Sequence, residues 1–435
     1  MNDKEIYERK KGLYFMKKAE YKYENFLIFV CAFLYASSMA AKGIFIAEQK
    51  YIVDLWGLKY AEASIANTYY FVLYAFIQVV LFIIISKLDI VKYVLFTVPL
   101  AAITTALIGT ASKIGDISLF FGISGIFQGG IYCACNYVLT KYLPSELLTK
   151  ANKIMNAMYA VGTVIAYAIC AFFITWDLWR VPYFLIGGIF LFSLVLFGIV
   201  VRRFERIKKE RKIYTPTKEV DSLSENEQIL LLNGKRSSIV FYFFVILFTV
   251  LISALYYSIM NYITALLVDV HGMSQNLSIY VSIIAPIAVT FGPIFTINSC
   301  SKTQDFIAVG IRYLLYILPV PLLLLFFYDS HFLVAILLSV FFIVIAQGVK
   351  TIVLSVIAFQ MRNQINVGAY AAITNAVASV SAGVTPMIIG KIIDVSGWKV
   401  SYGVIFILIV VIVVALCLLK IFIRRFKQRV NKNQM

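Results

Sequence analysis

The sequence is poor in charged residues and histidine, and these shortages exclude several classes of protein. Only 14% of its 435 residues are charged, against about 25% in a typical soluble domain. The two histidines, His271 and His331, and the six scattered cysteines do not have the spacing of a zinc site or a disulfide framework. The sequence also contains no nucleophile–base pair and no phosphate-binding loop. It therefore predicts no metal site, no cofactor and no enzymatic activity.

Hydrophobic residues make up most of what is present: 61% of the chain, with a mean hydropathy of +0.88. A bilayer core about 30 Å thick needs about 20 apolar residues in a helix. Stretches of this kind predict an all-α membrane protein with twelve transmembrane helices. They lie at residues 25–50, 62–86, 91–112, 117–141, 151–175, 181–201, 239–267, 276–299, 304–328, 331–358, 367–394 and 398–420.

The formal net charge of +17 comes from basic residues outside these stretches. Most of the 39 Lys and Arg residues fall in the N-terminal segment, the even-numbered connections and the C-terminal segment. Because loops rich in Lys and Arg remain on the cytoplasmic side, we expect a multi-pass protein of the cell membrane with both termini cytoplasmic. Contact with anionic lipid headgroups accounts for the basic segments. Binding to nucleic acid is not expected.

A long polar segment divides the apolar stretches six and six. We predict a cytoplasmic N-terminal segment (1–24), a six-helix bundle (25–201), a cytoplasmic linker (202–238), a second six-helix bundle (239–420) and a cytoplasmic tail (421–435). Matches at offsets of 215 or 219 relate the halves: Val53–Gly57 to Val268–Gly272, Lys87 to Lys302, Gln128-Gly129 to Gln347-Gly348, Asn156-Ala157 to Asn375-Ala376, and Trp179-Arg180 to Trp398-Lys399. Since an even number of spans separates each pair, the halves should share one orientation about an axis along the membrane normal.

This organisation resembles the major facilitator superfamily across essentially the whole chain. Ser86–Lys92 is similar to a degenerate form of the family motif between the second and third helices, without its leading glycine and adjacent arginine. Gly125–Gly130 and the stretch from Asn375 to Trp398 are also similar to many members. The resemblance implies two bundles that rock about a central cavity lined by the first, fourth, seventh and tenth spans. It further implies conformational roles for Lys87, Asp89 and Lys302.

Two lysines stand inside apolar stretches that the resemblance places around this cavity. Lys42 lies about two-thirds of the way along the first stretch, and Lys350 lies well inside the tenth. A lysine near the membrane centre costs on the order of 2.5–3.5 kcal/mol on insertion scales, and such residues are commonly functional. No Asp or Glu lies in the middle of any stretch, with Glu48 near the outer end of the first. Two cations without a counter-ion predict a negatively charged solute. For Lys42, a side chain that reaches outward to the headgroups is the alternative.

Polar and aromatic side chains on the same helices extend the predicted site. Tyr35 and Lys42 are seven residues apart and share a helix face, with Ser38 between them. The predicted substrate-binding residues are Lys42, Lys350, Tyr35, Gln128, Tyr132, Tyr257, Asn261, Gln347, Asn156 and Asn375. Each amide or hydroxyl has the alternative role of joining neighbouring helices.

The leading hypothesis is a secondary active transporter that moves a small organic anion, a carboxylate or an organophosphate, by alternating access. Lys42 with Tyr35 two turns earlier is similar to the organophosphate:phosphate antiporters and related organic-anion carriers. The region of Tyr256, Tyr257 and Asn261 lacks their arginine, so Lys350 would supply the second charge. We expect a monomer whose partners are this substrate and the bilayer. Two alternatives stay open: a carrier of a neutral polar solute, such as a sugar or nucleoside, and a non-transporting membrane sensor.

Overall fold

The computed structural model describes residues 22–84, 87–210, 236–303, 305–360 and 367–432. Most of the predicted N-terminal segment, the centre of the predicted linker and the last three residues lie outside this part of the chain. Within it every regular element is a helix. Apolar side chains form two separate cores, one running from Leu27 to Phe204 and the other mainly from Val245 to Leu416.

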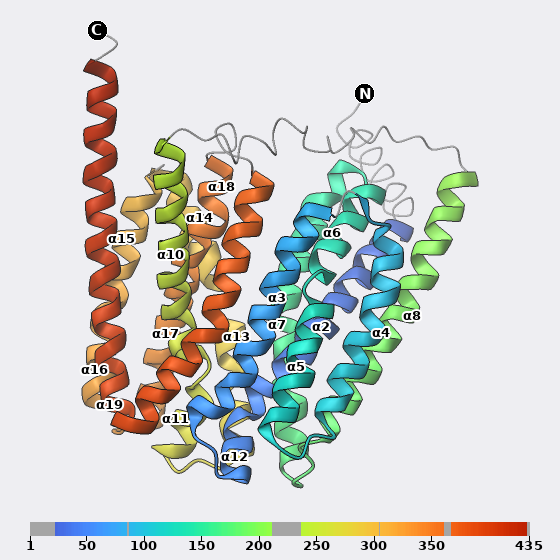
Figure 1. The fold of residues 1–435 in the computed structure, drawn as a ribbon, viewed down its shortest axis with the longest axis horizontal. Helices are drawn as coiled ribbons and strands as arrows, with labels where there is room; N and C mark the ends of the chain where they lie inside the picture. The colour runs from blue at the N-terminus through green and yellow to red at the C-terminus, as the bar shows by residue number, and fades with distance from the viewer. Residues whose placement is uncertain (1–21, 85–86, 211–235, 304, 361–366, 433–435) are drawn as a thin grey trace, which may run out of the picture.

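The first group of helices surrounds the first core. It consists of α2 (Lys22–Trp56), α3 (Tyr60–Ile84), α4 (Ile90–Ile108), α5 (Ile114–Gln128), α6 (Ile131–Tyr142), α7 (Ser145–Ile174) and α8 (Val181–Glu210). We call this group the first bundle. Figure 1 shows its helices on one side of the molecule, in blue to green.

The second bundle surrounds the second core and contains more interruptions. It consists of α10 (Arg236–Met260), α11 (Ile263–Asp269), α12 (Gln275–Ser282), α13 (Ile284–Ala288), α14 (Phe291–Thr303), α15 (Phe306–Ile317), α16 (Pro319–Phe327), α17 (Phe332–Thr351), the π-helical turn η2 (Ile352–Val356), α18 (Ile357–Gln360) and α19 (Val367–Lys432).

Eleven helical stretches of the described chain are long and apolar enough to cross a membrane, the last being Gly368–Cys417. Helix α19, to which that last stretch belongs, contains both predicted spans 367–394 and 398–420. Gly397 has φ +79° and breaks α19 between them, a conformation that glycine adopts without steric cost. Figure 1 shows the chain turning back at this point. The predicted fold class, an all-α membrane protein, is confirmed.

The sequence matches between the two halves coincide with matching local geometry. Gly57 and Gly272 both have a left-handed backbone, with φ +61° and +62°. Gly129 and Gly348 both stand where helices cross closely. An added Cβ would clash with Ile77 of α3 at the first and with Thr296 of α14 at the second. At these positions the sequence repeat is also a structural repeat.

The first transmembrane helix is longer than the sequence predicted, and this changes the position of two residues. The predicted span ended at residue 50, whereas α2 continues to Trp56. Lys42 therefore lies 14 residues from the helix end, about 21 Å at 1.5 Å per residue, and its side chain does not reach outward to the headgroups. Glu48 is not at the outer end of the span but fully buried, at 0% exposure, beside Cys170 of α7 and Tyr183 of α8. The expectation that no carboxyl group lies inside the protein was wrong.

The two bundles contact each other in two regions. The first part of α19 lies against α3, and α12 and α13 lie against α7. Figure 1 shows α3 and α19 side by side at the centre of the molecule. The start of α2 and the end of α19 lie at the same end of the molecule, which we call the terminal end. The opposite end, where α2 and α11 finish, is called the far end.

Candidate functional site

Lys42 is held inside the protein by aromatic rings. The residue is 9% exposed. Its Nζ lies 4.7 Å from the ring centroid of Tyr159 in α7 and 5.8 Å from that of Phe71 in α3. Both separations fall within the range of cation–π attraction. In the part of the chain that the structure describes, Lys42 forms no ion pair with a carboxylate.

Lys350 has a closely similar environment in the second bundle. It is 8% exposed near the end of α17. Its Nζ donates a hydrogen bond to the hydroxyl of Tyr257 at 3.3 Å, and it lies 4.7 Å and 5.1 Å from the ring centroids of Tyr257 and Tyr256. The π-helical turn η2 follows almost directly, and such turns occur frequently at functional sites. As with Lys42, the described residues contain no carboxylate paired with it.

The aromatic surroundings of the two lysines meet at the contact between the bundles. The rings of Phe71 and Tyr257, which contact Lys42 and Lys350 respectively, are 6.1 Å apart. Charges are poorly screened in such surroundings, so two like charges this near the same contact repel one another. An anion between the two ammonium groups would replace this repulsion with two attractions.

Three further predicted residues form a cluster beside Lys42, toward the terminal end. The rings of Tyr35 and Tyr132 are 4.9 Å apart. The hydroxyl of Tyr132 donates to Oδ1 of Asn156 at 3.1 Å, and Asn156 is exposed. Tyr35 lies seven residues, or about two helical turns, before Lys42 on the same face of α2. The cluster thus places ring faces and an amide about two helical turns from Lys42, on its terminal side.

The side-chain amide of Gln128 forms hydrogen bonds within the first bundle. Its Oε1 accepts from Ser38 at 3.0 Å and from the hydroxyl of Tyr70 at 3.1 Å, and its Nε2 donates to Ser124 at 2.7 Å. These bonds tie α2, α3 and α5 together. This is the joining role that amides often have between membrane helices.

The remaining predicted binding residues make fewer contacts. Asn261 donates through Nδ2 to the carbonyl of Tyr257 one turn earlier, at 3.1 Å. Gln347 is half-buried, and its Oε1 has no hydrogen-bond partner among the described residues. Asn375 is exposed on α19, and its carbonyl accepts from Ser379. None of these three forms a hydrogen bond with Lys42 or Lys350 within the described chain.

The residues predicted to have conformational roles lie on the surface at the terminal end. Lys87 and Lys302 are exposed. Asp89 caps α4 by accepting from the backbone N–H groups of Val91 and Lys92, at 3.2 and 3.3 Å. The bond from the Lys92 backbone is the main cause that lowers the pKa of Asp89 below its usual value. Capping is thus a local role for Asp89, and a conformational role for the three residues stays a prediction.

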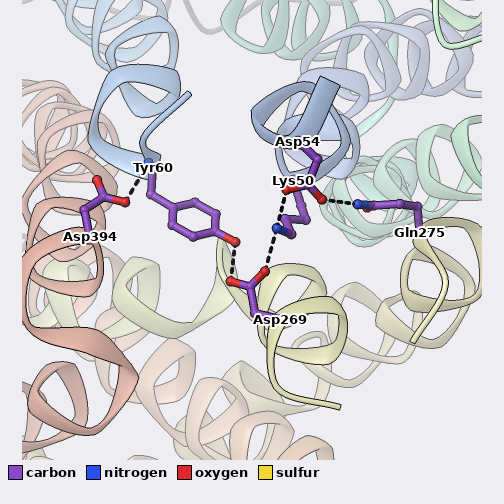
Figure 2. A network of polar contacts seen from close by, with 6 residues as sticks. All are labelled: Lys50, Asp54, Tyr60, Asp269, Gln275 and Asp394. Atoms are coloured by element: carbon purple, nitrogen blue, oxygen red, sulfur yellow. Dashed lines mark hydrogen bonds and ion pairs between the residues drawn. The ribbon is translucent and has the colours of Figure 1, made fainter. Parts of the chain in front are cut away.

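Sequence reasoning missed a polar network at the far end (Figure 2). Nζ of Lys50 forms ion pairs at 2.5 Å with Asp54 of its own helix and with Asp269 of α11. The hydroxyl of Tyr60 donates to Asp269 at 2.6 Å. Asp394 of α19 accepts from the backbone N–H groups of Tyr60 and Ala61, each at 2.9 Å. The available signal was the repeated Val-Asp pair, which places Asp54 and Asp269 at equivalent positions of the two halves.

A second, buried polar layer lies between this network and Lys42. Gln49 donates to the hydroxyl of Ser64 at 2.9 Å and accepts from Asn67 at 3.0 Å. Ser64 lies 3.1 Å from the hydroxyl of Tyr262, which donates to the carbonyl of Pro386 in α19. Gln49 is seven residues beyond Lys42 on the same face of α2. The two layers therefore separate Lys42 from the far end.

The sequence matches the model of one known protein family. The model of the Major Facilitator Superfamily matches residues 28–365. A bacterial homologue of the human lysosomal transporter Spinster, solved in an inward-facing and unoccupied conformation, superposes with a TM-score of 0.71 at 14% identity, over 91% of this chain and 97% of that chain. The nucleoside transporter NupG superposes with a TM-score of 0.68 at 16% identity, over 90% and 98%. At these identities the similarity concerns the fold. No curated protein sequence matches the chain.

Proposed function

This chain belongs to the Major Facilitator Superfamily and is a membrane transporter, and from that premise we propose that it carries a small organic anion by alternating access. The observation that carries the proposal is the pair Lys42 and Lys350. These two buried ammonium groups come from opposite bundles, and neither has a carboxylate partner within the described residues.

The cost of burying these charges supports an anionic substrate. Buried charges in proteins are normally paired or hydrogen-bonded. Here the contacts are ring faces and, for Lys350, one phenolic hydroxyl. A carboxylate or phosphate oxygen accepts charge-assisted hydrogen bonds from lysine, which are about twice as strong as neutral ones. A bound anion therefore compensates both lysines at once and contacts both bundles.

The arrangement of the bundles supports access from one end at a time. Polar contacts join the bundles at the far end, whereas Asn156 and Asn375 are exposed toward the terminal end. We infer that the terminal end faces the cytoplasm, since the described basic residues Lys141, Lys150 and Arg202 lie at this end. On this proposal the site is closed to the outside and is reached from the cytoplasm, in a cell membrane with both termini cytoplasmic.

A neutral polar solute, such as a nucleoside, is the second candidate. Oε1 of Gln347, which has no hydrogen-bond partner among the described residues, could accept a bond from such a solute, and the rings of Tyr35 and Tyr132 offer faces for stacking. One of the structures with the same fold is a nucleoside transporter by its description. For such a solute, the lysines would interact with the aromatic rings around them and not with the substrate.

Uptake into proteoliposomes distinguishes the two candidates. Radiolabelled monocarboxylates, dicarboxylates and sugar phosphates are compared with sugars and nucleosides. We expect uptake of an anion, and its loss in both Lys42→Ala and Lys350→Ala. Lys113→Ala, which removes an exposed lysine, is the matched control and retains uptake. Uptake of neutral solutes only, or anion uptake unchanged in both site variants, would contradict the proposal.

A further inference from the structure

The network at the far end is asymmetric: its two carboxylates are repeated in the two halves of the chain, but its lysine is not. Asp54 lies in the last turn of α2 and Asp269 is the last residue of α11, at equivalent positions of the two halves. The residue equivalent to Lys50 in the second half is Ala265. One lysine therefore serves two carboxylates, one from each bundle (Figure 2). Its side chain is only 9% exposed, so solvent screens the pair with Asp269 weakly.

Other contacts of the network also cross from one bundle to the other. Gln275 of α12 donates to Asp54 at 2.5 Å. Asp394 accepts the backbone N–H groups of Tyr60 and Ala61, at the point where α3 begins. The first N–H groups of a helix have no partner within the helix, and a carboxylate there also interacts favourably with the helix dipole. The first turn of α3 is thus capped by a residue of the other bundle.

These contacts exist only while the far end is closed. When the bundles separate there, Lys50 keeps Asp54, which lies one turn away on its own helix, but loses Asp269. Asp269 then loses the one cation that it pairs with among the described residues, and the first turn of α3 loses its cap. Removing one partner from a partly buried charge pair is costly because the other charge is left unpaired. The network therefore favours the closed far end over the open one.

We propose that Lys50 is a positioning residue of the transport cycle, which holds the far end closed by pairing Asp54 and Asp269 while the site at Lys42 and Lys350 is reached from the terminal end. This inference rests on alternating access, as proposed above, but not on the charge of the substrate. Lys50 itself does not contact the site. It acts by setting the proportion of molecules that are closed at the far end.

Distances between the bundles test this directly in the full-length protein without any substrate. Spin labels are attached at Lys59→Cys and Lys399→Cys for the far end, and at Thr149→Cys and Ser301→Cys for the terminal end. These four positions are exposed, and each pair joins the two bundles. The exposed Cys133 and Cys417 are replaced by serine in all samples. Pulsed electron paramagnetic resonance then gives the distance distribution at each end.

In Lys50→Ala we expect the ratio of far-end-open to far-end-closed molecules to rise on the order of tenfold, the size of a typical conformational coupling. The far-end distance should lengthen while the terminal-end distance shortens. A merely structural role would not produce these opposite changes. Tyr51→Phe is the matched control, because it removes a hydrogen bond at the same end of α2 to Asp177 of the same bundle. This variant should leave both distributions unchanged.

Two further variants keep the proposal testable if Lys50→Ala does not fold. Asp269→Asn leaves Lys50 paired with Asp54 and should still open the far end. The exchange Lys50→Asp with Asp269→Lys restores opposite charges across the bundles and should return both distributions toward the wild type. Unchanged distributions in Lys50→Ala and Asp269→Asn would overturn the proposal. Because no substrate is present, failure of the anion hypothesis in uptake experiments leaves this result intact, and the reverse is also true.

Discussion

If Lys42 is an uncompensated charge in the empty site, removing it should stabilise the protein while abolishing its activity. Lys42→Met keeps the length of the side chain and removes the ammonium group. A lysine at this depth costs about 3 kcal/mol. The cation–π contacts with Tyr159 and Phe71 offset about 1 kcal/mol of this cost each. The variant should therefore gain about 1 kcal/mol in its free energy of unfolding.

Thermal unfolding of the purified protein measures this change. A gain of about 1 kcal/mol raises Tm by about 2–4 °C for a unit the size of one bundle. The matched control is Lys391→Met, which removes an exposed lysine and should change stability by less than about 0.5 kcal/mol. A transported anion should raise Tm in the wild type, since ligands that bind the native state stabilise it, but not in Lys42→Met. A lower Tm in Lys42→Met would refute the reasoning, because it would mean that the charge is already compensated.

Three other predictions concern single contacts. Asp394→Ala removes the cap of α3 and should cost about 0.5–2 kcal/mol of stability, seen as a lower Tm, whereas Asp394→Asn should retain most of it. Gly129→Ala places a Cβ against α3 and should cost about 1–3 kcal/mol in the same assay, while Gly188→Ala, where the space is open, should be tolerated. Tyr132→Phe removes the bond to Asn156 but keeps the ring, so uptake kinetics should show a KM raised severalfold while the free energy of unfolding falls by about 1 kcal/mol or less. An unchanged KM in that variant would remove Tyr132 from substrate binding.

Gln128 and Tyr132 illustrate how far sequence patterns reach. The two residues are four apart on one helix face, so the sequence assigns them the same role and the same alternative. In the structure, Gln128 is tied to Ser38, 90 residues away, and to Tyr70. Tyr132 instead faces Tyr35 and Asn156. Helical periodicity places both residues on a face, but the neighbouring helices determine which amide is already used by the protein.

The sequence by itself determined that this is a membrane protein built from apolar helices, and that two lysines lie within them. This follows because the length and polarity of a spanning helix are local properties of about 20 consecutive residues. Only the tertiary structure decided that α2 continues to Trp56, that Glu48 is buried and that the rings beside Lys42 and Lys350 meet between the bundles. It also decided the far-end network, in which Tyr60 and Asp269 meet across 209 residues of chain. Such contacts depend on how distant helices pack against one another, which no local pattern of residues specifies.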